Sequence, residues 1–321
     1  MKNNNNQTNN NDNAVSSTEE TLNTRVIITH PGIFHADDVC SVAFLRLLGV
    51  TAPVERRVPS AADLEDPTVL VLDIGGRHEP SLLNFDHHQF THEDWAAGRG
   101  ARWDGVPYAA FGLLADHFAH ANPQVHQRFD ERLVQPVDAA DCGWGSIEGD
   151  RPTLSFSAVI TGFNPGPDAT PAERIAAFDA AVEVAKQVIA NTTAEAEAFV
   201  EARDTVSGAD TAVGDRVLIL EKFVPWSEHL FDRADQHDLL YVVFPSLRGG
   251  FCVQQVPEEP DSFKGRKALP EAWAAKRGQE LAELLGLSSG GDATFCHGGR
   301  FVGGAETLED CLKMARLAVE S

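Results

Sequence analysis

The chain is poor in basic residues, paired cysteines and long apolar runs, and each shortage removes a class of protein. Its 26 Lys and Arg face 48 Asp and Glu, a formal charge of −22, whereas a protein that grips long nucleic acid normally has a basic face. The five cysteines include no CxxC pair, which argues against a disulfide framework or a thiolate zinc site and favours a cytoplasmic protein. No uncharged apolar run of about 18 residues occurs, so we expect no membrane span.

The first 23 residues are rich in asparagine and contain no apolar segment. Such a composition cannot bury enough surface to fold, so we expect residues 1–23 to form a disordered tail. Without an apolar core, this stretch does not resemble a signal peptide.

Apolar periodicity divides the rest of the chain into two parts. In the first, short apolar runs alternate with helical patterns, which predicts an α/β domain over residues 24–207 with a mostly parallel sheet. We expect strands at residues 25–30, 69–72 and 82–85, and helices at residues 37–48, 107–120, 123–135 and 171–203, the last as one helix or two. Beyond a boundary at residues 207–215, we expect a smaller α+β domain over residues 208–321, with strands at 217–220, 239–244 and 251–256 and helices at 281–285 and 308–319.

Histidines and aspartates stand where the predicted strands of the first domain end. The carboxyl ends of the strands in an open α/β sheet form its ligand crevice, so side chains from these three places should meet at one edge. The residues concerned are His30 with His35 and Asp37, then Asp73, and then Asp86, His87 and His88.

Imidazole and carboxylate ligands without thiolate suit Mn²⁺, with Mg²⁺, Co²⁺ or Zn²⁺ as alternatives. Seven candidates exceed the needs of one tetrahedral site, but two ions about 3.5–4 Å apart that share a bridging carboxylate, expected to be Asp86, would use them all. Each residue taken alone also has a purely structural explanation. Asp73 before a Gly-Gly pair, for example, is a common turn former. Their combination at three strand ends is what predicts a metal site.

The segments THPGIFHADD, LDIGG and FDHHQ, in this order and spacing, resemble the DHH phosphoesterase superfamily and, within it, the Myg family. Further matches are VPYAAFGLLADHF, VDAADCG, PWSEHL, RKALPEAW and FCHGGRFVGG, so the resemblance extends from residue 26 to the C-terminus. It implies a first domain with two Mn²⁺ or Mg²⁺ ions and a second domain that closes over the substrate. The superfamily usually has His-x3-Asp-x-Asp in its first motif, whereas this chain has His30-x4-His35-x-Asp37, as the Myg type does.

The resemblance also assigns roles by position. A fourth motif within VDAADCG supplies one more carboxylate, either Asp138 or Asp141, with Asp141 preferred. The metal ligands implied are therefore His30, His35, Asp37, Asp73, Asp86, His87 and one of these two aspartates. His87 or His88, beside Asp86, is expected to act on the leaving oxygen.

The C-terminal part supplies candidate substrate contacts. Glycines in HGGRFVGG let backbone N–H groups approach an anion, and Arg300 adds charge, although a tight turn between strand and helix explains the same letters. The resemblance favours substrate contact. The candidates are Arg300, His297, Gly298 and Gly299, with His229 and Arg266 weaker, and Arg56 and Arg57 in the first domain have a surface role as an equal alternative. We expect Cys142 to be a buried, small apolar residue.

Together these observations predict a metal-dependent phosphoesterase that hydrolyses phosphodiester bonds with two metals. The negative charge does not oppose this, because bound divalent cations can invert the local field. The resemblance implies a 3′–5′ exonuclease on RNA or short oligonucleotides. The expected partner is a short single-stranded nucleic acid or a nucleotide, and a homo-oligomer stays open.

Two alternatives remain at this point. A phosphatase or pyrophosphatase on a small nucleotide or phosphoanhydride would use the same ions. A non-catalytic, metal-binding regulatory protein is disfavoured by the complete ligand set. An amidohydrolase is disfavoured further, because the chain has neither the HxH signature nor an eight-fold βα repetition.

Overall fold

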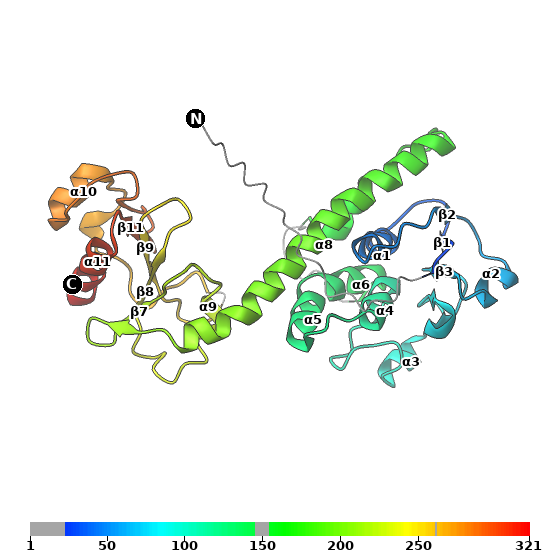
Figure 1. Ribbon diagram of the computed structural model, residues 1–321, viewed down its shortest axis with the longest axis horizontal. Coiled ribbons are helices and arrows are strands. Elements are labelled where there is room, and N and C mark those ends of the chain that lie inside the picture. Colours follow the sequence, from blue (N-terminus) through cyan, green and yellow to red (C-terminus); the bar gives the residue numbers. More distant parts are fainter. Residues whose placement is uncertain (1–22, 145–153, 261) are drawn as a thin grey trace, which may run out of the picture. The chain divides into compact units, whose positions relative to one another are not determined.

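The computed structural model describes residues 23–144, 154–260 and 262–321, so the expected tail lies almost wholly outside the described residues. The chain divides into two compact units between Ala196 and Glu197. This division falls inside helix α8 (Pro171–Ser207), upstream of the boundary expected at residues 207–215. Helices and sheets are mixed along the chain, as expected for the α/β class (Figure 1).

The first unit contains a five-stranded sheet in the order β2-β1-β3-β5-β4. Parallel pairs join β1 (Val26–Thr29) to β2 (Val54–Arg56) and β3 (Val69–Leu72), and β3 to β5 (Asn84–Phe85); β4 (His78–Glu79) is antiparallel to β5. All residues of β1 and β3 are buried, as in strands covered on both faces. The carboxyl ends of β2, β1, β3 and β5 therefore lie along one edge of the sheet, and Figure 1 shows the first three side by side.

Short helices surround this sheet, and α1 packs against α4, α6 and α7. Their bounds are α1 (Ala36–Leu47), α2 (Ala61–Glu65), α3 (His92–Ala96), α4 (Ala110–His117), α5 (Pro123–Phe129), α6 (Gln135–Asp141) and α7 (Phe156–Thr161), with a 3₁₀ turn at η1 (Pro80–Leu82). A π-helical turn, η2 (Asp130–Val134), joins α5 directly to α6. The sequence predicted one helix over residues 123–135 but not this turn.

The N-terminus of α4 has no capping side chain of its own, because its N-cap residue is Ala109. Instead, the carboxylate of Asp37 in α1 accepts hydrogen bonds from the first two backbone N–H groups of α4, at 3.1 and 2.6 Å. Asp138 in α6 accepts a third bond, at 3.0 Å, from the N–H of Gly112. Three donors that an α-helix leaves unpaired are thus satisfied by buried carboxylates from two other helices, and the helix dipole favours negative charge there.

The second unit contains a six-stranded sheet in the order β10-β11-β9-β8-β7-β6, in which β7 and β8 are parallel and the other neighbours antiparallel. Its elements are β6 (Thr211–Ala212), β7 (Val217–Ile219), α9 (Ser227–Leu230), β8 (Tyr241–Pro245), β9 (Phe251–Gln255), η3 (Glu271–Trp273), α10 (Gly278–Leu285), β10 (Phe295–Cys296), β11 (Val302–Ala305) and α11 (Leu308–Glu320). One face packs on α10 and α11, and the other packs on α9 and the end of α8.

The glycine-rich segment HGGRFVGG differs from its sequence prediction. Its first five residues, 297–301, form the turn of a hairpin between β10 and β11, and its last three belong to β11, so it does not link a strand to a helix. Among the helices that the structure describes, none is both long and apolar enough to cross a bilayer.

Gly112→Ala tests the capping of α4. A Cβ atom at this position would lie 1.8 Å from Oδ2 of Asp138, so we expect the variant to lose at least about 2 kcal/mol of unfolding free energy. Gly166→Ala is the control, because its Cβ atom would meet no atom within 4 Å, and it should stay within about 1 kcal/mol of the parent. Urea unfolding followed by circular dichroism measures both; equal stabilities would show that the close approach to Asp138 is not required.

Candidate metal-binding site

Asp73 stands at the end of β3 in a backbone conformation that turns its side chain toward the sheet edge. Its φ is 54°, in the left-handed region that aspartate tolerates better than most residues. The chain then leaves the strand through Gly75, with φ 106°, and Gly76, with φ 65°. Strain of this kind gathers where a structure must hold one side chain in place.

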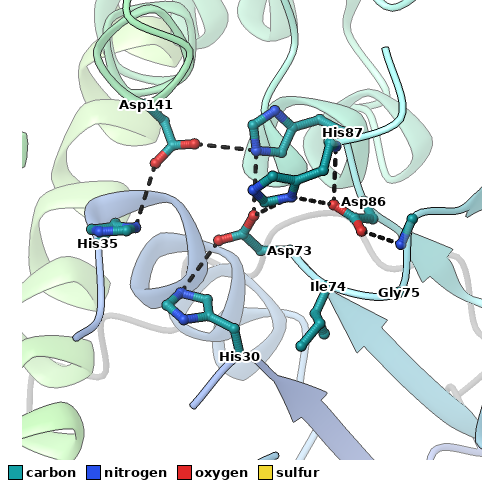
Figure 2. A pocket seen from close by; sticks show the side chains of 10 residues that line it. His30, His35, Asp73, Ile74, Gly75, Asp86, His87 and Asp141 are labelled. Carbon is teal, nitrogen blue, oxygen red and sulfur yellow. Dashed lines mark hydrogen bonds and ion pairs between the residues drawn. The ribbon is translucent and has the colours of Figure 1, made fainter. Parts of the chain in front are cut away.

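Three histidines approach the carboxylate of Asp73 (Figure 2). Oδ2 of Asp73 lies 3.5 Å from Nε2 of His30, which follows β1. Oδ1 lies 3.3 Å from Nε2 of His87 and 3.5 Å from Nδ1 of His88, both of which follow β5. As predicted from the strand ends, side chains that lie more than 50 positions apart in the sequence meet at this edge of the sheet.

Asp141, the last residue of α6, completes the far side of this cluster. One carboxylate oxygen lies 3.2 Å from Nε2 of His87 and the other lies 3.9 Å from Nδ1 of His35 (Figure 2). Asp138 lies one helical turn earlier and is not part of the cluster, because its carboxylate is used by Gly112 and Arg102. The structure therefore brings the preferred Asp141 to the other candidates, and not Asp138.

Three overlapping groups of donor atoms each lie within 4.8 Å of one another, a spacing that could hold a metal ion. The groups are His30, His35 and Asp73; Asp73, His87 and His88; and Asp37, Asp73, His87 and Asp141. Asp73 belongs to all three groups and is the shared carboxylate. Asp86, which we expected to bridge, belongs to none of them.

The carboxylate of Asp86 instead fixes the loop that carries His88. It accepts hydrogen bonds from the backbone N–H of Gly76 at 2.5 Å and of His88 at 3.2 Å, and it lies 2.7 Å from Nδ1 of His88. The hydrogen bond with Asp86 raises the pKa of His88, whose side chain is 62% exposed. Although burial opposes it, hydrogen bonding to His88 lowers the pKa of Asp86. Asp86 thus holds His88 at the cavity wall and favours the charged form of its imidazole.

Asp38 is a site residue that the sequence analysis missed. It is fully buried, and its Oδ2 lies 3.3 Å from Nε2 of His30, while its Oδ1 accepts from the backbone N–H of His35 at 2.9 Å. Burial, with the charge of Asp73, raises the pKa of Asp38 to about 7. The signal was the doubled aspartate in HADD, of which only Asp37 was used.

The electrostatics of the cluster show too much negative charge for its own cations. Burial, followed by repulsion from Asp73 and Asp141, raises the pKa of Asp37 well above its usual range. Burial opposes the charged form of His87 too, but the neighbouring carboxylates of Asp141 and Asp73 prevail and raise its pKa. Carboxylates crowded in this way are stabilised by an additional cation.

Several buried nitrogen and oxygen atoms of the cluster lie 3.2–3.5 Å from other polar atoms of the cluster but form no hydrogen bond. These atoms are Nε2 of His30, Oδ2 of Asp38, Oδ1 of Asp73 and Nε2 of His87. Buried polar atoms left without a partner are costly and call for an explanation. Hard oxygen and imidazole donors that converge on a cavity of about 580 Å³ fit a divalent cation.

The chain that carries this cluster is similar to known proteins over most of its length. A family model named MYG1_exonuc, described as "Uncharacterised protein family (UPF0160)", matches residues 26–319. The chain belongs to this family. The family expected from the sequence motifs is therefore confirmed, and the match covers every residue of the cluster.

Curated relatives align along most of the chain. The MYG1 exonuclease of Rattus norvegicus is 28% identical over 325 residues, which cover 90% of this chain and 83% of the relative. The MYG1 exonuclease of Homo sapiens is 28% identical over 324 residues, covering 90% and 84%. A MYG1 protein of Schizosaccharomyces pombe is 27% identical over 336 residues, covering 92% and 97%. No solved structure matches the chain significantly.

In this member of the family, the loop between His30 and His35 is held by a residue outside the motifs. The side-chain amide of Asn164 accepts from the N–H of Phe34 at 2.9 Å and donates to its carbonyl at 2.8 Å. Both backbone groups of Phe34 are thereby satisfied by one side chain. This clamp fixes the loop that presents both histidines.

The candidate substrate residues of the second unit are engaged within that unit. Nε2 of His229 is 2.7 Å from the carbonyl of Phe199, and the guanidinium of Arg266 donates to the carbonyls of Gln236 and Leu239. Arg300, at φ 59°, donates to the carbonyl of Leu269 at 3.2 Å. His297, Gly298 and Gly299 are exposed at the hairpin turn.

In the first unit, Arg57 pairs with Glu55 and Asp63, at 2.7 and 2.8 Å, which supports its surface alternative. Cys142 is half-buried, with its Sγ 3.6 Å from Nδ1 of His87. Its thiol therefore touches the ring edge opposite the cluster rather than the cluster itself.

Arg102→Met tests the ion pair that supports Asp138. The guanidinium of Arg102 is buried and lies 2.7 Å from Asp138 and 2.6 Å from Asp130. Removing it leaves a buried carboxylate without its cation, so we expect a loss of about 3–5 kcal/mol. Arg99→Met is the control, because Arg99 pairs with Asp94 at the surface, where such a pair contributes about 0–1 kcal/mol.

The deficit of Arg102→Met should depend on pH. Burial raises the pKa of Asp138 from 3.8 to about 7, although Arg102 lowers it. The Asp138 carboxyl therefore favours folding below its unfolded pKa, and this contribution is lost as pH rises through the folded pKa. Removing Arg102 raises that pKa further, so the deficit should widen above about pH 7. Urea unfolding at pH 5.5 and 8.5 measures it, and a deficit larger at pH 5.5 would contradict this account.

Proposed function

We propose that this chain is a metal-dependent phosphodiesterase that removes nucleotides from the 3′ end of RNA or short oligonucleotides. The observation that carries the proposal is the position of Asp73, whose carboxylate is common to three groups of potential metal donors. Relatives that bear the name MYG1 exonuclease, and that align with this chain over 83–84% of their own length, support a nuclease activity. An acidic chain suits a short single strand better than a long duplex.

Two divalent cations, Mn²⁺ before Mg²⁺, Co²⁺ or Zn²⁺, fit the number and type of the donors. His30, His35 and Asp73 would hold one ion, and Asp37, Asp73, His87 and Asp141 would hold the other. Such ions supply an acidified water as nucleophile and positive charge beside the phosphoryl oxygens. Asp73, which belongs to both groups, would contribute to holding both ions, the part that the sequence analysis gave to Asp86.

The two histidines that follow β5 have different roles in this proposal. His87 is buried and its Nε2 faces two carboxylates, so it is committed to the cluster. His88 is exposed and lines the cavity, while Asp86 holds its Nδ1 and favours its charged form. Because Asp86 engages Nδ1 of His88, Nε2 is the ring nitrogen that would donate a proton to the oxygen that leaves the phosphorus atom.

The two aspartates of α6 provide a matched test of the metal ligands. Asp141→Asn removes a donor from the cluster, so metal content and turnover should fall together, by a factor of at least about 100 in kcat. Asp138→Asn resembles the protonated form of a group outside the cluster and should keep its metal. Metal content is measured by plasma mass spectrometry and activity with Mn²⁺ after chelator treatment. Full activity in the metal-free parent, or metal loss only in Asp138→Asn, would refute the assignment.

The polarity of cleavage can be read from labelled RNA. A single-stranded RNA labelled at its 5′ end should shorten in steps of one nucleotide from its 3′ end, whereas a 3′-labelled copy should release labelled mononucleotide at once. Inorganic pyrophosphate and a nucleoside triphosphate are run in parallel. Hydrolysis of these compounds with intact RNA would replace the exonuclease by a phosphatase or pyrophosphatase that uses the same site.

A further inference from the structure

A second cavity of about 460 Å³ lies in the first unit, beside the metal-binding site. Its floor is formed by the loop after β1, at Pro31 and Gly32, and by the carboxyl end of β2, at Arg56 and Arg57. β2 pairs in parallel with β1, so this cavity opens at the same sheet edge as the metal-binding site. Its volume is in the range of small-molecule sites.

Arg56 forms the boundary between the two cavities. Its guanidinium lies 4.8 Å from the ring centre of Phe178 and 5.4 Å from that of Phe34, which holds it in place. Its Nη2 lies 3.8 Å from Asp38, and Asp38 in turn lies 3.3 Å from His30 of the metal-binding site. The two cavities are therefore connected through Arg56, Asp38 and His30, and Pro31 and Gly32 of the second cavity directly follow His30 of the first.

Arg174 supplies the positive charge that the second cavity offers to a ligand. Arg56 and Arg57 also line the cavity, but Arg56 lies near Asp38 and Arg57 pairs with Glu55 and Asp63. Two backbone carbonyls, at 2.8 and 3.3 Å, orient the guanidinium of Arg174 without neutralising it. An anion is therefore attracted to this cavity.

The remaining wall of the cavity is apolar. It is formed by one face of the first turns of α8, where Pro171, Ile175 and Phe178 line the cavity opposite Pro31. Ile175 is 59% exposed, although burying it would be favourable. An exposed apolar wall beside an oriented guanidinium suits a base and its phosphate.

We propose that this second cavity binds the nucleotide next to the cleaved phosphodiester, with its base against Ile175 and Pro171 and its phosphate beside Arg174. This subsite rests on the proposed nuclease function and deepens it. Through it, the chain gains affinity for a strand of at least two nucleotides over a mononucleotide. Arg56 stays in place as the link to Asp38, so it is not the residue to change in a test.

Arg174→Ala and Ile175→Ser test the subsite. Each removes one half of the proposed contact, and both side chains lie at the surface of α8, where substitution leaves the core intact. We expect the Kd for a fluorescein-labelled tetranucleotide, measured by anisotropy in EDTA, to rise about tenfold in each variant. With Mn²⁺, KM for the tetranucleotide should rise similarly, whereas kcat on bis(p-nitrophenyl) phosphate, which fills only the metal cavity, should not change.

Matched controls lie further along the same helix. Arg203→Ala removes a half-exposed arginine, and Val184→Ser removes an apolar side chain that is 37% exposed. Neither residue lines the cavity, so both controls should bind the tetranucleotide as the parent does. Parent-like Kd and KM in both cavity variants, or an equal loss in the controls, would overturn the subsite.

A free mononucleotide has the same base and phosphate as a nucleotide within a strand. A competition experiment with AMP distinguishes these two ligands. If the cavity variants lose affinity for AMP but keep the parent's affinity for the tetranucleotide, the cavity serves a free mononucleotide and the proposal fails. Failure of the nuclease proposal reads differently, because the parent would then cleave no phosphodiester whatever the variants bind. If the two variants still bound the tetranucleotide more weakly than the parent in that case, the result would support the subsite.

Discussion

The N-terminal turn of α4 depends on acceptors that it does not carry itself. Asp37 and Asp138 reach it from α1 and α6, and Gly112 is the residue at which the second carboxylate approaches the helix backbone. Because these bonds are buried, the three helices hold one another in a fixed relation. Helices α1 and α6, which bring Asp37 and Asp141 to the sheet edge, are therefore positioned by the same set of hydrogen bonds. The geometry of the donor cluster thus depends on the capping of α4.

The carboxylate of Asp138 and the carboxylates around Asp73 differ in the positive charges beside them. Asp138 has Arg102 beside it, stacked 4.2 Å from the ring centre of Tyr108, so its charge is met by a fixed cation of the chain. In the cluster around Asp73, by contrast, the cationic groups near the buried carboxylates, among the described residues, are imidazoles and the more distant Nη2 of Arg56. The carboxylate that supports the fold thus has a fixed cation beside it, whereas the carboxylates at the cavity are the ones to which we assign the proposed metal ions.

Much of this site could be predicted because its residues follow strands. His30 and Asp73 were placed correctly at one edge, since the buried runs at residues 26–29 and 69–72 have a single reading as parallel strands. The choice between Asp138 and Asp141 needed the structure. The two residues are three positions apart and share a helix face, so only the packing of α6 shows which one reaches His87. The role of Asp86 depended on a backbone N–H at Gly76, which no side-chain pattern encodes.

The π-helical turn η2 has a consequence for how this chain tolerates change. A π turn contains one residue more than an α turn over nearly the same rise, so it takes up one extra residue without changing the phase of the helix that follows. Losing a single residue between Asp130 and Val134 would turn this segment into an ordinary α turn and keep Asp138 at Gly112 and Asp141 at His87. Losing a residue between Gln135 and Asp138 would instead rotate the later part of α6 by about 100° about its axis and move Asp141 away from His87. A change of one residue in length is therefore tolerated in η2 and not in the first turn of α6, although neither segment contains a donor to the cluster.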